Sequence, residues 1–424
     1  MKENKPFHKF KQGEKYILLD ICGGGVYVID EEIYNALDRA DYALTPEYAE
    51  LCKEGLFAGR DDYQSYADQK VDAPLKALCL HVSHDCNLRC EYCFAEGIIE
   101  NATMSVETAK AAVDFLIQAS GEREALEIDF FGGEPLMAWE TVVETVKYAK
   151  RQNKDFKLTL TTNGLLLDDE KIEFINNEIH NVVLSLDGRR EINDKMRRCK
   201  NGAGSYDLVL PKFQKLVQSR AKAGFTDYFI RGTFTGYNLD FAEDVLSLAD
   251  EGFRNISIEP VAVCREQPCA LLEEHLPRIK DEYDRLLVFA QNSDWRFFHF
   301  FVDLHNSPCI LKRLRGCGAG NEYVAVTPDG NIFPCHRYVG LDEWKMGNIK
   351  DGVLNASIKE YFAKMHIYAK ENCPDCWARF YCGGGCNAES FIFEGDAKKQ
   401  SDLTCELMKK RFECAIALAI DRNF

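Results

Sequence analysis

The chain has 424 residues, of which 46% are hydrophobic and 28% charged, and its formal net charge is −16. This length allows two or three domains with a sizeable core, and the acidic balance argues against a nucleic-acid partner. No apolar run approaches the ~20 residues that a membrane-spanning helix needs, and the N-terminus lacks a signal-peptide pattern. We therefore expect a globular protein of the cytoplasm, with no membrane partner. There thiols stay reduced, so the 18 cysteines suit metal binding better than disulfides.

The first 70 residues predict a small domain. Two β-rich runs at residues 15–22 and 25–30 flank a glycine cluster that is typical of a hairpin. Residues 31–41 and 45–55 then have helical patterns, and Thr45 with the following Pro and Glu supplies a typical helix start. The polar residues 61–74 predict a linker to the next domain.

Residues 75–291 alternate strand-like and helix-like segments. Six candidate strands cover residues 76–83, 126–131, 157–162, 182–187, 228–234 and 255–261. Amphipathic stretches between them cover residues 106–120, 139–152, 169–177, 206–224 and 239–252. Six successive βα units predict an α/β fold with a parallel sheet, because each helix returns the chain to start a parallel strand. A partial (β/α)6 barrel of this kind would place its active site at the carboxyl ends of the strands.

The chain after residue 292 is first rich in aromatic residues and then in cysteine and glycine, with little regular periodicity. Such a segment builds little apolar core, so we expect bound metal clusters to stabilise it. We expect three domains, at residues 1–70, 75–291 and 292–424.

Three cysteines follow the first strand of the alternating region. Cys86, Cys90 and Cys93 have the spacing C-x3-C-x2-C, which brings three thiolates onto one short loop. Soft thiolates suit iron better than carboxylates do, and a loop of this length can wrap one face of a [4Fe–4S] cluster. Three ligands leave one of the four irons open for a chelating cosubstrate.

A glycine-rich turn, Gly132-Gly133-Glu134, follows the second strand. Together with the three cysteines and the βα pattern, it resembles the radical S-adenosylmethionine (SAM) superfamily. The resemblance implies that SAM binds the open iron through its amino and carboxylate groups and is cleaved by one electron. Gly132 and Gly133 would let backbone polar groups approach the SAM ammonium, and Glu134 would add an acceptor.

The same resemblance implies further SAM contacts. Residues at the ends of the third and fourth strands would face the ribose or methionyl part of SAM: Asn163, Ser185 and Asp187. Tyr92 matches an aromatic position near the adenine. Arg197 resembles the arginine that meets the SAM carboxylate, and Arg198 beside it is a rival for that role.

Seven cysteines in the C-terminal third match the signature of the SPASM extension, whose members modify peptides and proteins. The resemblance implies two auxiliary [4Fe–4S] clusters, and thus three clusters in all. The outer cluster would be held by Cys373, Cys376, Cys382 and Cys405. The inner cluster would be held by Cys317, Cys335 and Cys386, which leaves it one ligand short.

Two alternatives remain for the fourth site of the inner cluster. Cys309 is a possible ligand. The other alternative, which we favour, is an open iron that binds and activates a substrate thiolate.

The chain as a whole resembles maturases that form thioether cross-links in cysteine-rich precursor peptides, especially the SCIFF and ranthipeptide group. The N-terminal domain resembles the winged-helix-like recognition element of such enzymes, which captures a leader peptide as an added strand. The resemblance implies a precursor peptide as substrate and a flavodoxin or ferredoxin as electron donor. Formylglycine formation on a sulfatase, carbon–carbon cross-linking and a non-catalytic binding protein are the rival interpretations.

Overall fold

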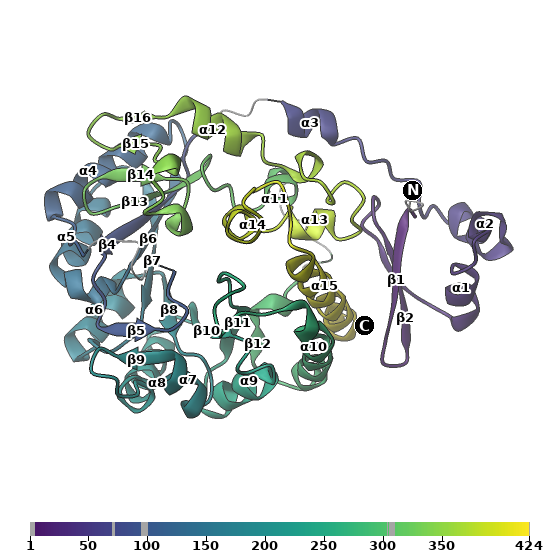
Figure 1. The fold of residues 1–424 in the computed structure, drawn as a ribbon, viewed down its shortest axis with the longest axis horizontal. Helices are drawn as coiled ribbons and strands as arrows, with labels where there is room; N and C mark the ends of the chain where they lie inside the picture. The colour runs from purple at the N-terminus through teal and green to yellow at the C-terminus, as the bar shows by residue number, and fades with distance from the viewer. Residues whose placement is uncertain (1–4, 70–72, 95–100, 303, 305–309, 424) are drawn as a thin grey trace. The chain divides into compact units, whose positions relative to one another are not determined.

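The structure is a computed structural model that describes residues 5–69, 73–94, 101–302, 304 and 310–423. Its chain forms two compact units (Figure 1). The first unit comprises residues 1–70, 279–316 and 364–424, and the second comprises residues 71–278 and 317–363. Each unit is therefore assembled from separate segments of the chain. The three domains expected from the sequence remain a prediction.

The second unit is built on a parallel sheet. Six of its strands lie in the order β4-β6-β7-β8-β10-β11, and each is parallel to its neighbours. They are β4 (Ala77–Ser83), β6 (Ala125–Gly132), β7 (Asp155–Thr162), β8 (Asn181–Ser185), β10 (Tyr228–Phe234) and β11 (Asn255–Pro260). These are the six predicted strands, and the predicted α/β class with a parallel sheet is confirmed.

Helices surround this sheet on its outer side (Figure 1). They are α4 (Val106–Ala119), α5 (Trp139–Ala149), α6 (Asp169–Glu178), α7 (Arg190–Met196), α8 (Tyr206–Lys222) and α9 (Phe241–Asp250). Alternate residues of β6, β7, β8 and β10 are buried, as Leu126, Ile128 and Phe130 show on β6, whereas β4 is buried throughout.

The sheet continues beyond β4 into the cysteine-rich part of the chain. β13 (Tyr323–Val326) pairs parallel with β4, and three short antiparallel strands follow it. They are β14 (Asn331–Phe333), β15 (Gly347–Asn348) and β16 (Val353–Leu354), with α12 (Ala356–Ala363) next in the chain. The expectation that this region builds little apolar core is wrong for β13, whose residues 324–326 are fully buried. Four residues are too few to show a period in the sequence.

A small antiparallel sheet opens the first unit. Its strands lie in the order β1 (Phe7–Gln12), β2 (Lys15–Asp20) and β3 (Val26–Ile29), with α1 (Glu31–Ala36) and α2 (Pro46–Lys53) after them. Their shared core consists of Phe7, Leu18, Leu37, Leu51 and Leu56. The hairpin and both helices were predicted, whereas β1 was missed.

The remainder of the first unit differs more from the expectations. The predicted linker contains the short helix α3 (Gln64–Asp68), which forms because Ala67 packs against Leu314 and Ile367. The other elements are α10 (Leu276–Gln291), β12 (Arg296–Phe297), α11 (Ile310–Arg315), α13 (Arg379–Cys382), α14 (Asn387–Glu394) and α15 (Asp402–Asn423). The 22-residue α15 was not expected, because residues 414–420 form one continuous buried apolar run without helical periodicity. Within the described ranges, no helix is long and apolar enough to cross a membrane.

Candidate active site

The three cysteines of the C-x3-C-x2-C motif lie on the loop that leaves the carboxyl end of β4. Cys90 ends the short strand β5 (Leu88–Cys90), which pairs with β9 (Arg197–Cys199) so that Cys90 faces Arg197. Burial, with a smaller contribution from the neighbouring Cys93, raises the pKa of Cys86 to about 11 and that of Cys90 to about 12. The three sulfur atoms therefore lie close to one another.

The surroundings of these thiols fit an iron–sulfur cluster. The backbone N–H of Leu88 donates to Cys86 Sγ at 3.4 Å and Asn163 Nδ2 donates to the same sulfur at 3.6 Å. Arg197 Nη1 lies 3.9 Å from Cys90 Sγ. Donors of this kind stabilise thiolates and tune a cluster. No group of three His, Cys, Asp or Glu in the described part of the chain could hold a single metal ion. A [4Fe–4S] cluster does not need three ligands that converge on a single ion, because each thiolate binds a separate iron.

The two glycines after β6 allow its end to pack directly on the cysteine loop. A Cβ at Gly132 would lie 2.1 Å from the carbonyl oxygen of Ser83, and one at Gly133 would lie 2.4 Å from that of Asp85. Gly132 also has φ +123°, a conformation that glycine adopts readily. The glycine turn therefore lets the end of β6 pack on the cysteine loop. Whether the backbone of this turn also approaches the SAM ammonium stays a prediction.

Glu134 connects the ends of two neighbouring strands. Its carboxylate is almost fully buried and accepts hydrogen bonds from the backbone N–H groups of Leu136 at 3.0 Å and Asn163 at 2.8 Å. Thr162 Oγ1 also donates to it, at 2.7 Å. Burial raises the pKa of Glu134, while these hydrogen bonds oppose the shift. Glu134 therefore positions the end of β7 against the glycine turn, whatever contact it makes with SAM.

Asn163 directly follows β7 and lies beside Glu134. Its Nδ2 donates to Asn87 Oδ1 at 2.7 Å, within the cysteine loop, and its Oδ1 accepts from Leu165 N at 3.0 Å. Ser185 ends the next strand, β8. Both residues thus stand at carboxyl ends of strands, on the side of the sheet where the loop lies.

The buried Asp187 and the half-buried Arg197 and Tyr92 form one cluster beside Cys90. The Tyr92 hydroxyl donates to both oxygens of Asp187, at 2.7 and 2.8 Å, and Arg197 Nε donates to Asp187 at 3.0 Å. Asp187 is fully buried, and the Thr233 backbone N–H is a further donor to it at 3.1 Å. Burial raises the pKa of Tyr92 well above its usual value. Arg198 is exposed on β9, so the structure places Arg197, and not its rival, in this cluster.

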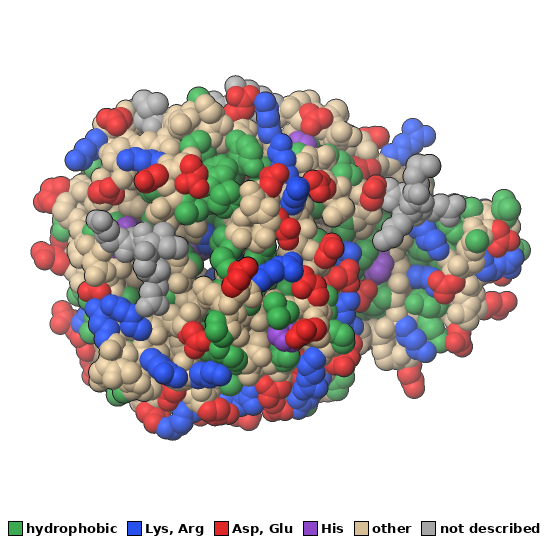
Figure 2. All heavy atoms as spheres, viewed as in Figure 1, with side chains coloured by type: hydrophobic (Ala, Val, Ile, Leu, Met, Phe, Trp, Pro, Cys, Tyr) green, Lys and Arg blue, Asp and Glu red, His purple; other side chains and the backbone are tan. Residues whose placement is uncertain are grey.

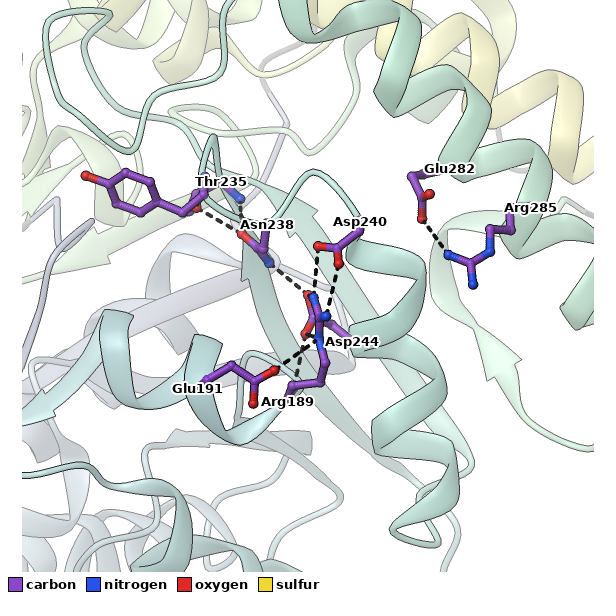
Figure 3. Close-up of polar contacts among 9 residues, drawn as sticks. Arg189, Glu191, Thr235, Asn238, Asp240, Asp244, Glu282 and Arg285 are labelled. Atoms are coloured by element: carbon purple, nitrogen blue, oxygen red, sulfur yellow. Dashed lines mark hydrogen bonds and ion pairs between the residues drawn. The ribbon is translucent and has the colours of Figure 1, made fainter.

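A second network, which the sequence did not indicate, fixes the turn that carries Asp187. Arg189 donates to Asp244 at 2.8 Å and to Asp240 at 2.9 and 3.0 Å, and Asn238 Nδ2 donates to Asp244 at 2.9 Å (Figure 3). Burial raises the pKa of Asp244, while Arg189 and Asn238 oppose that shift. The partners stand 49 to 55 residues away in the chain, so only the fold reveals the network.

Histidines also lie near the cysteine loop. His81 on β4 is 1% exposed, and neither of its ring nitrogens has a hydrogen-bond partner among the described residues. Its ring lies 5.4 Å from that of His84 and 5.8 Å from that of Phe131, which in turn lies 5.0 Å from His336. Burial lowers the pKa of His81 to about 3, so this ring is neutral.

The four cysteines expected at the outer cluster lie in the first unit. Burial raises the pKa of Cys373 and of Cys405 to about 12, and the thiols of Cys376 and Cys382 contribute to both shifts. The buried Lys370 lowers the pKa of Cys373 and bonds Gly384 O at 2.5 Å and Asn387 Oδ1 at 2.7 Å. The four cysteines expected to hold the outer cluster are thus brought together, with Lys370 beside Cys373.

The cysteines expected at the inner cluster are divided between the units. Cys317 and the buried Cys335 belong to the second unit, and Cys386 at the start of α14 belongs to the first. Cys309 lies outside the described residues. Both alternatives for the fourth ligand therefore remain open.

Comparison with known proteins identifies two domains. The radical SAM superfamily matches residues 80–226, and the SPASM iron–sulfur cluster-binding domain matches residues 317–377. The chain thus carries both domains that its cysteine motifs indicated.

Similar proteins extend over most of the chain. Radical SAM cyclopropyl synthase TigE of Paramaledivibacter caminithermalis is 22% identical over 94% of this chain and 92% of its own length. A cysteine-type anaerobic sulfatase-maturating enzyme of Clostridium perfringens is 26% identical over 82% of this chain and 98% of its own. Mycofactocin maturase MftC of Mycolicibacterium smegmatis is 26% identical over 77% and 81%.

Solved structures share the fold. The structure of anSMEcpe with bound AdoMet has a TM-score of 0.68 at 22% identity and covers 83% of this chain and 96% of that one. Streptococcus suis SuiB bound to precursor peptide SuiA has a TM-score of 0.57 at 14% identity and covers 94% and 98%. At these identities the likeness concerns the fold alone.

Proposed function

We propose that this chain, a member of the radical SAM superfamily with a SPASM domain, installs thioether cross-links between cysteine and acceptor residues of a cysteine-rich precursor peptide. The observation that carries the proposal is the loop of Cys86, Cys90 and Cys93 at the carboxyl ends of six parallel strands, beside the cluster that Arg197 and Tyr92 form around the buried Asp187. Carboxyl strand ends are where sheets of this kind hold their active sites.

The chain's own residues would bind and orient the cofactors. Cys86, Cys90 and Cys93 would hold a [4Fe–4S] cluster, which together with SAM supplies hydrogen abstraction from an unactivated carbon. Arg197 stays charged because the Asp187 carboxylate raises its pKa by more than burial lowers it. We assign it to the SAM carboxylate, with Asn163, Ser185 and Asp187 along the rest of SAM and Tyr92 near the adenine.

The SPASM cysteines supply the second part of the proposal. Cys373, Cys376, Cys382 and Cys405 lie close together, with Lys370 near Cys373 and Cys382 and Lys409 near Cys405, which suits a thiolate-ligated outer cluster. We assign Cys317, Cys335 and Cys386 to an inner cluster, which makes three clusters in all. An open iron there would hold the substrate cysteine as a thiolate for bond formation, and this need for a substrate thiol distinguishes thioether chemistry from its rivals.

The N-terminal sheet offers an edge for the leader of the peptide. β3 is an end strand of the three-stranded sheet, and its Tyr27 and Val28 are 39% and 54% exposed. The other end strand, β1, is tied to α15 through a 2.9 Å contact between His8 and Glu413. We propose that the leader adds as a strand beside β3, a recognition mode that exposed sheet edges support.

A second candidate function is formylglycine formation on a sulfatase or carbon–carbon cross-linking. The similarity to the sulfatase-maturating enzyme over 82% of this chain favours the former. Both would use the same cysteine sets, but neither would need a substrate thiolate at the inner cluster.

The test of the SAM site uses anaerobically reconstituted protein. Changing Cys86, Cys90 and Cys93 together to alanine should remove about four of about twelve irons and abolish 5′-deoxyadenosine formation. The control changes the exposed Cys52 and Cys264 to alanine and should keep both. SAM cleavage that survives in the triple variant would refute the assignment.

A further inference from the structure

Lys370 is a buried cation beside the four cysteines expected at the outer cluster. It is 3% exposed, and its Nζ donates to the carbonyl oxygen of Gly384 at 2.5 Å and to Asn387 Oδ1 at 2.7 Å. Both acceptors are neutral oxygens, so these two bonds hold the ammonium without cancelling its charge. Figure 2 shows other Lys and Arg side chains at the surface, interspersed with Asp and Glu. Water and salt weaken the fields of such surface charges, whereas a charge in the interior is screened much less.

The backbone that Lys370 contacts is a glycine run between two of the proposed cluster ligands. Residues 383–385 are three glycines that separate Cys382 from Cys386, with φ +65°, +88° and +70°. Glycine adopts this conformation readily, and Gly384 also leaves room for the lysine, since a Cβ there would lie 3.2 Å from Lys370 Cδ. Turns in which successive N–H groups face one side form concavities that bind anions, iron–sulfur clusters among them. The glycine run and the cation therefore meet next to the proposed outer cluster.

The thiols beside Lys370 respond to its charge. Burial raises the pKa of Cys373 to about 12, and Lys370 is the main group that opposes this shift. Burial, with Cys376 nearby, raises the pKa of Cys382, while backbone hydrogen bonds from the glycine run and the charge of Lys370 lower it. Lys370 and the glycine run thus both favour negative charge on sulfur atoms that would hold the outer cluster.

We propose that the buried ammonium of Lys370 raises the reduction potential of the outer cluster, an inference that rests on the outer cluster of the proposed function. A [4Fe–4S] cluster with four thiolates is anionic, and its reduction adds one more negative charge. A nearby buried cation stabilises the reduced form more than the oxidised form, because the Coulomb energy grows with the charge. The reduction adds one electron to the cluster, with no bond formed or broken and no proton transferred.

A raised potential has a use in the proposed cross-linking reaction. For each thioether the peptide loses a hydrogen atom from the acceptor carbon, a proton from the cysteine thiol and one electron. The hydrogen atom goes to the 5′-deoxyadenosyl radical and the proton to solvent, so the electron needs an acceptor. By stabilising the reduced form, Lys370 would favour the oxidised outer cluster as that acceptor.

The test measures the midpoint potential of the outer cluster by redox titration followed by electron paramagnetic resonance. The full-length chain is reconstituted anaerobically with Cys86, Cys90 and Cys93 changed to alanine, which removes the cluster at the SAM site. In this parent protein, the signal of the outer cluster is the one that disappears when Cys405 is also changed to alanine. Iron content and urea unfolding of each variant report effects on cluster binding and stability separately.

Three variants of the parent protein are compared. Lys370→Gln removes the charge but keeps a hydrogen-bond donor, and it should raise the ratio of oxidised to reduced outer cluster at a fixed potential at least tenfold. For one electron, tenfold is a midpoint lower by about 59 mV. Lys370→Arg keeps the charge and should change the ratio less than about threefold. Lys409→Gln is the matched control and should also stay below about threefold, because Lys409 lies near Cys405 but is 34% exposed and pairs with Glu406 at 3.0 Å.

Asn387→Asp decides the question if Lys370→Gln fails to hold the cluster. It keeps the size of the side chain and the hydrogen bond to Lys370 but compensates the ammonium in place, so the ratio should again rise at least tenfold. An outer-cluster midpoint that matches the parent in Asn387→Asp, or equal shifts in Lys370→Gln and Lys370→Arg, would overturn the role of the Lys370 charge. If no signal of the parent depends on Cys405, the outer cluster of the proposed function is itself refuted.

Discussion

Asp187 shows how one buried side chain organises the proposed site. Three donors converge on its carboxylate, namely Tyr92, Arg197 and the Thr233 backbone. It thereby joins the cysteine loop, the β9 strand and β10 at one point. The sequence singled out Asp187 through its place after a strand, but it gave no indication that Tyr92 and Arg197 share this one acceptor.

Replacement of Asp187 by Asn should destabilise the fold by about 3 kcal/mol, because it leaves the half-buried Arg197 charge without its carboxylate partner. The free energy of unfolding in urea, with the iron content per chain, measures this. Asp207→Asn is the control, since Asp207 pairs with Arg190 and both are more than half exposed. Its cost should stay below about 1 kcal/mol. Equal effects of the two variants would show that Asp187 does not carry the cluster.

Asp129 on β6 predicts a pH dependence of stability. Burial, with Glu127 nearby, raises its pKa from 3.8 to about 6, while Thr159 and Lys76 oppose the shift. The folded state thus binds the proton more tightly than the unfolded state. The contribution of this protonation to the free energy of unfolding is fully present below about pH 4 and is lost as the pH rises through about 6. The resulting penalty at neutral pH is at most about 3 kcal/mol.

Asp129→Asn should therefore be more stable than the wild type near pH 8, and the difference should shrink toward pH 5. Urea unfolding of both proteins at several pH values measures it, with Asp155→Asn on the exposed end of β7 as the control. A difference that does not change with pH would contradict the buried, protonation-sensitive carboxyl.

At the scale of elements, the β3 edge carries the leader proposal. Val28→Asp places a charge on this exposed strand and should weaken binding of a fluorescently labelled precursor peptide at least tenfold, because an added strand must pack beside it. SAM cleavage without peptide should not change. Leu44→Asp is the matched control, since Leu44 is 85% exposed in the same small domain. Unchanged fluorescence anisotropy titrations for Val28→Asp would dispose of the β3 edge as the leader site.

The elements also show what the sequence could reveal. The six parallel strands and their helices were predictable, because apolar runs of six to eight residues alternate with long amphipathic stretches. β1 was missed because Lys and Gln interrupt its apolar pattern, and α15 because its buried end is continuously apolar. The cysteine spacings are local and could be found, whereas the Arg189 network joins residues about 50 apart and could not.

At the scale of the molecule, chain order does not predict which segments pack together. The N-terminal 70 residues share a compact unit with the last 61 residues, although about 300 residues separate them. Arg379 is one such link, since it contacts Asp61 Oδ2 at 3.1 Å, Cys376 O at 3.0 Å and Cys22 Sγ at 3.6 Å. The proposed leader domain and the proposed outer-cluster loop are thus bonded through one side chain that the sequence did not single out.

The most direct test of the proposed function is the mass of the peptide product. The chain is co-expressed anaerobically with a short cysteine-rich peptide chosen by a search of the neighbouring reading frames, and the peptide is alkylated and sequenced by tandem mass spectrometry. Thioether formation predicts a loss of two hydrogens for each cross-link, with the linked cysteines protected from alkylation. The Cys86, Cys90 and Cys93 triple variant should leave the peptide unmodified. A modified peptide whose cysteines all remain open to alkylation would contradict thioether formation and favour a carbon–carbon cross-link.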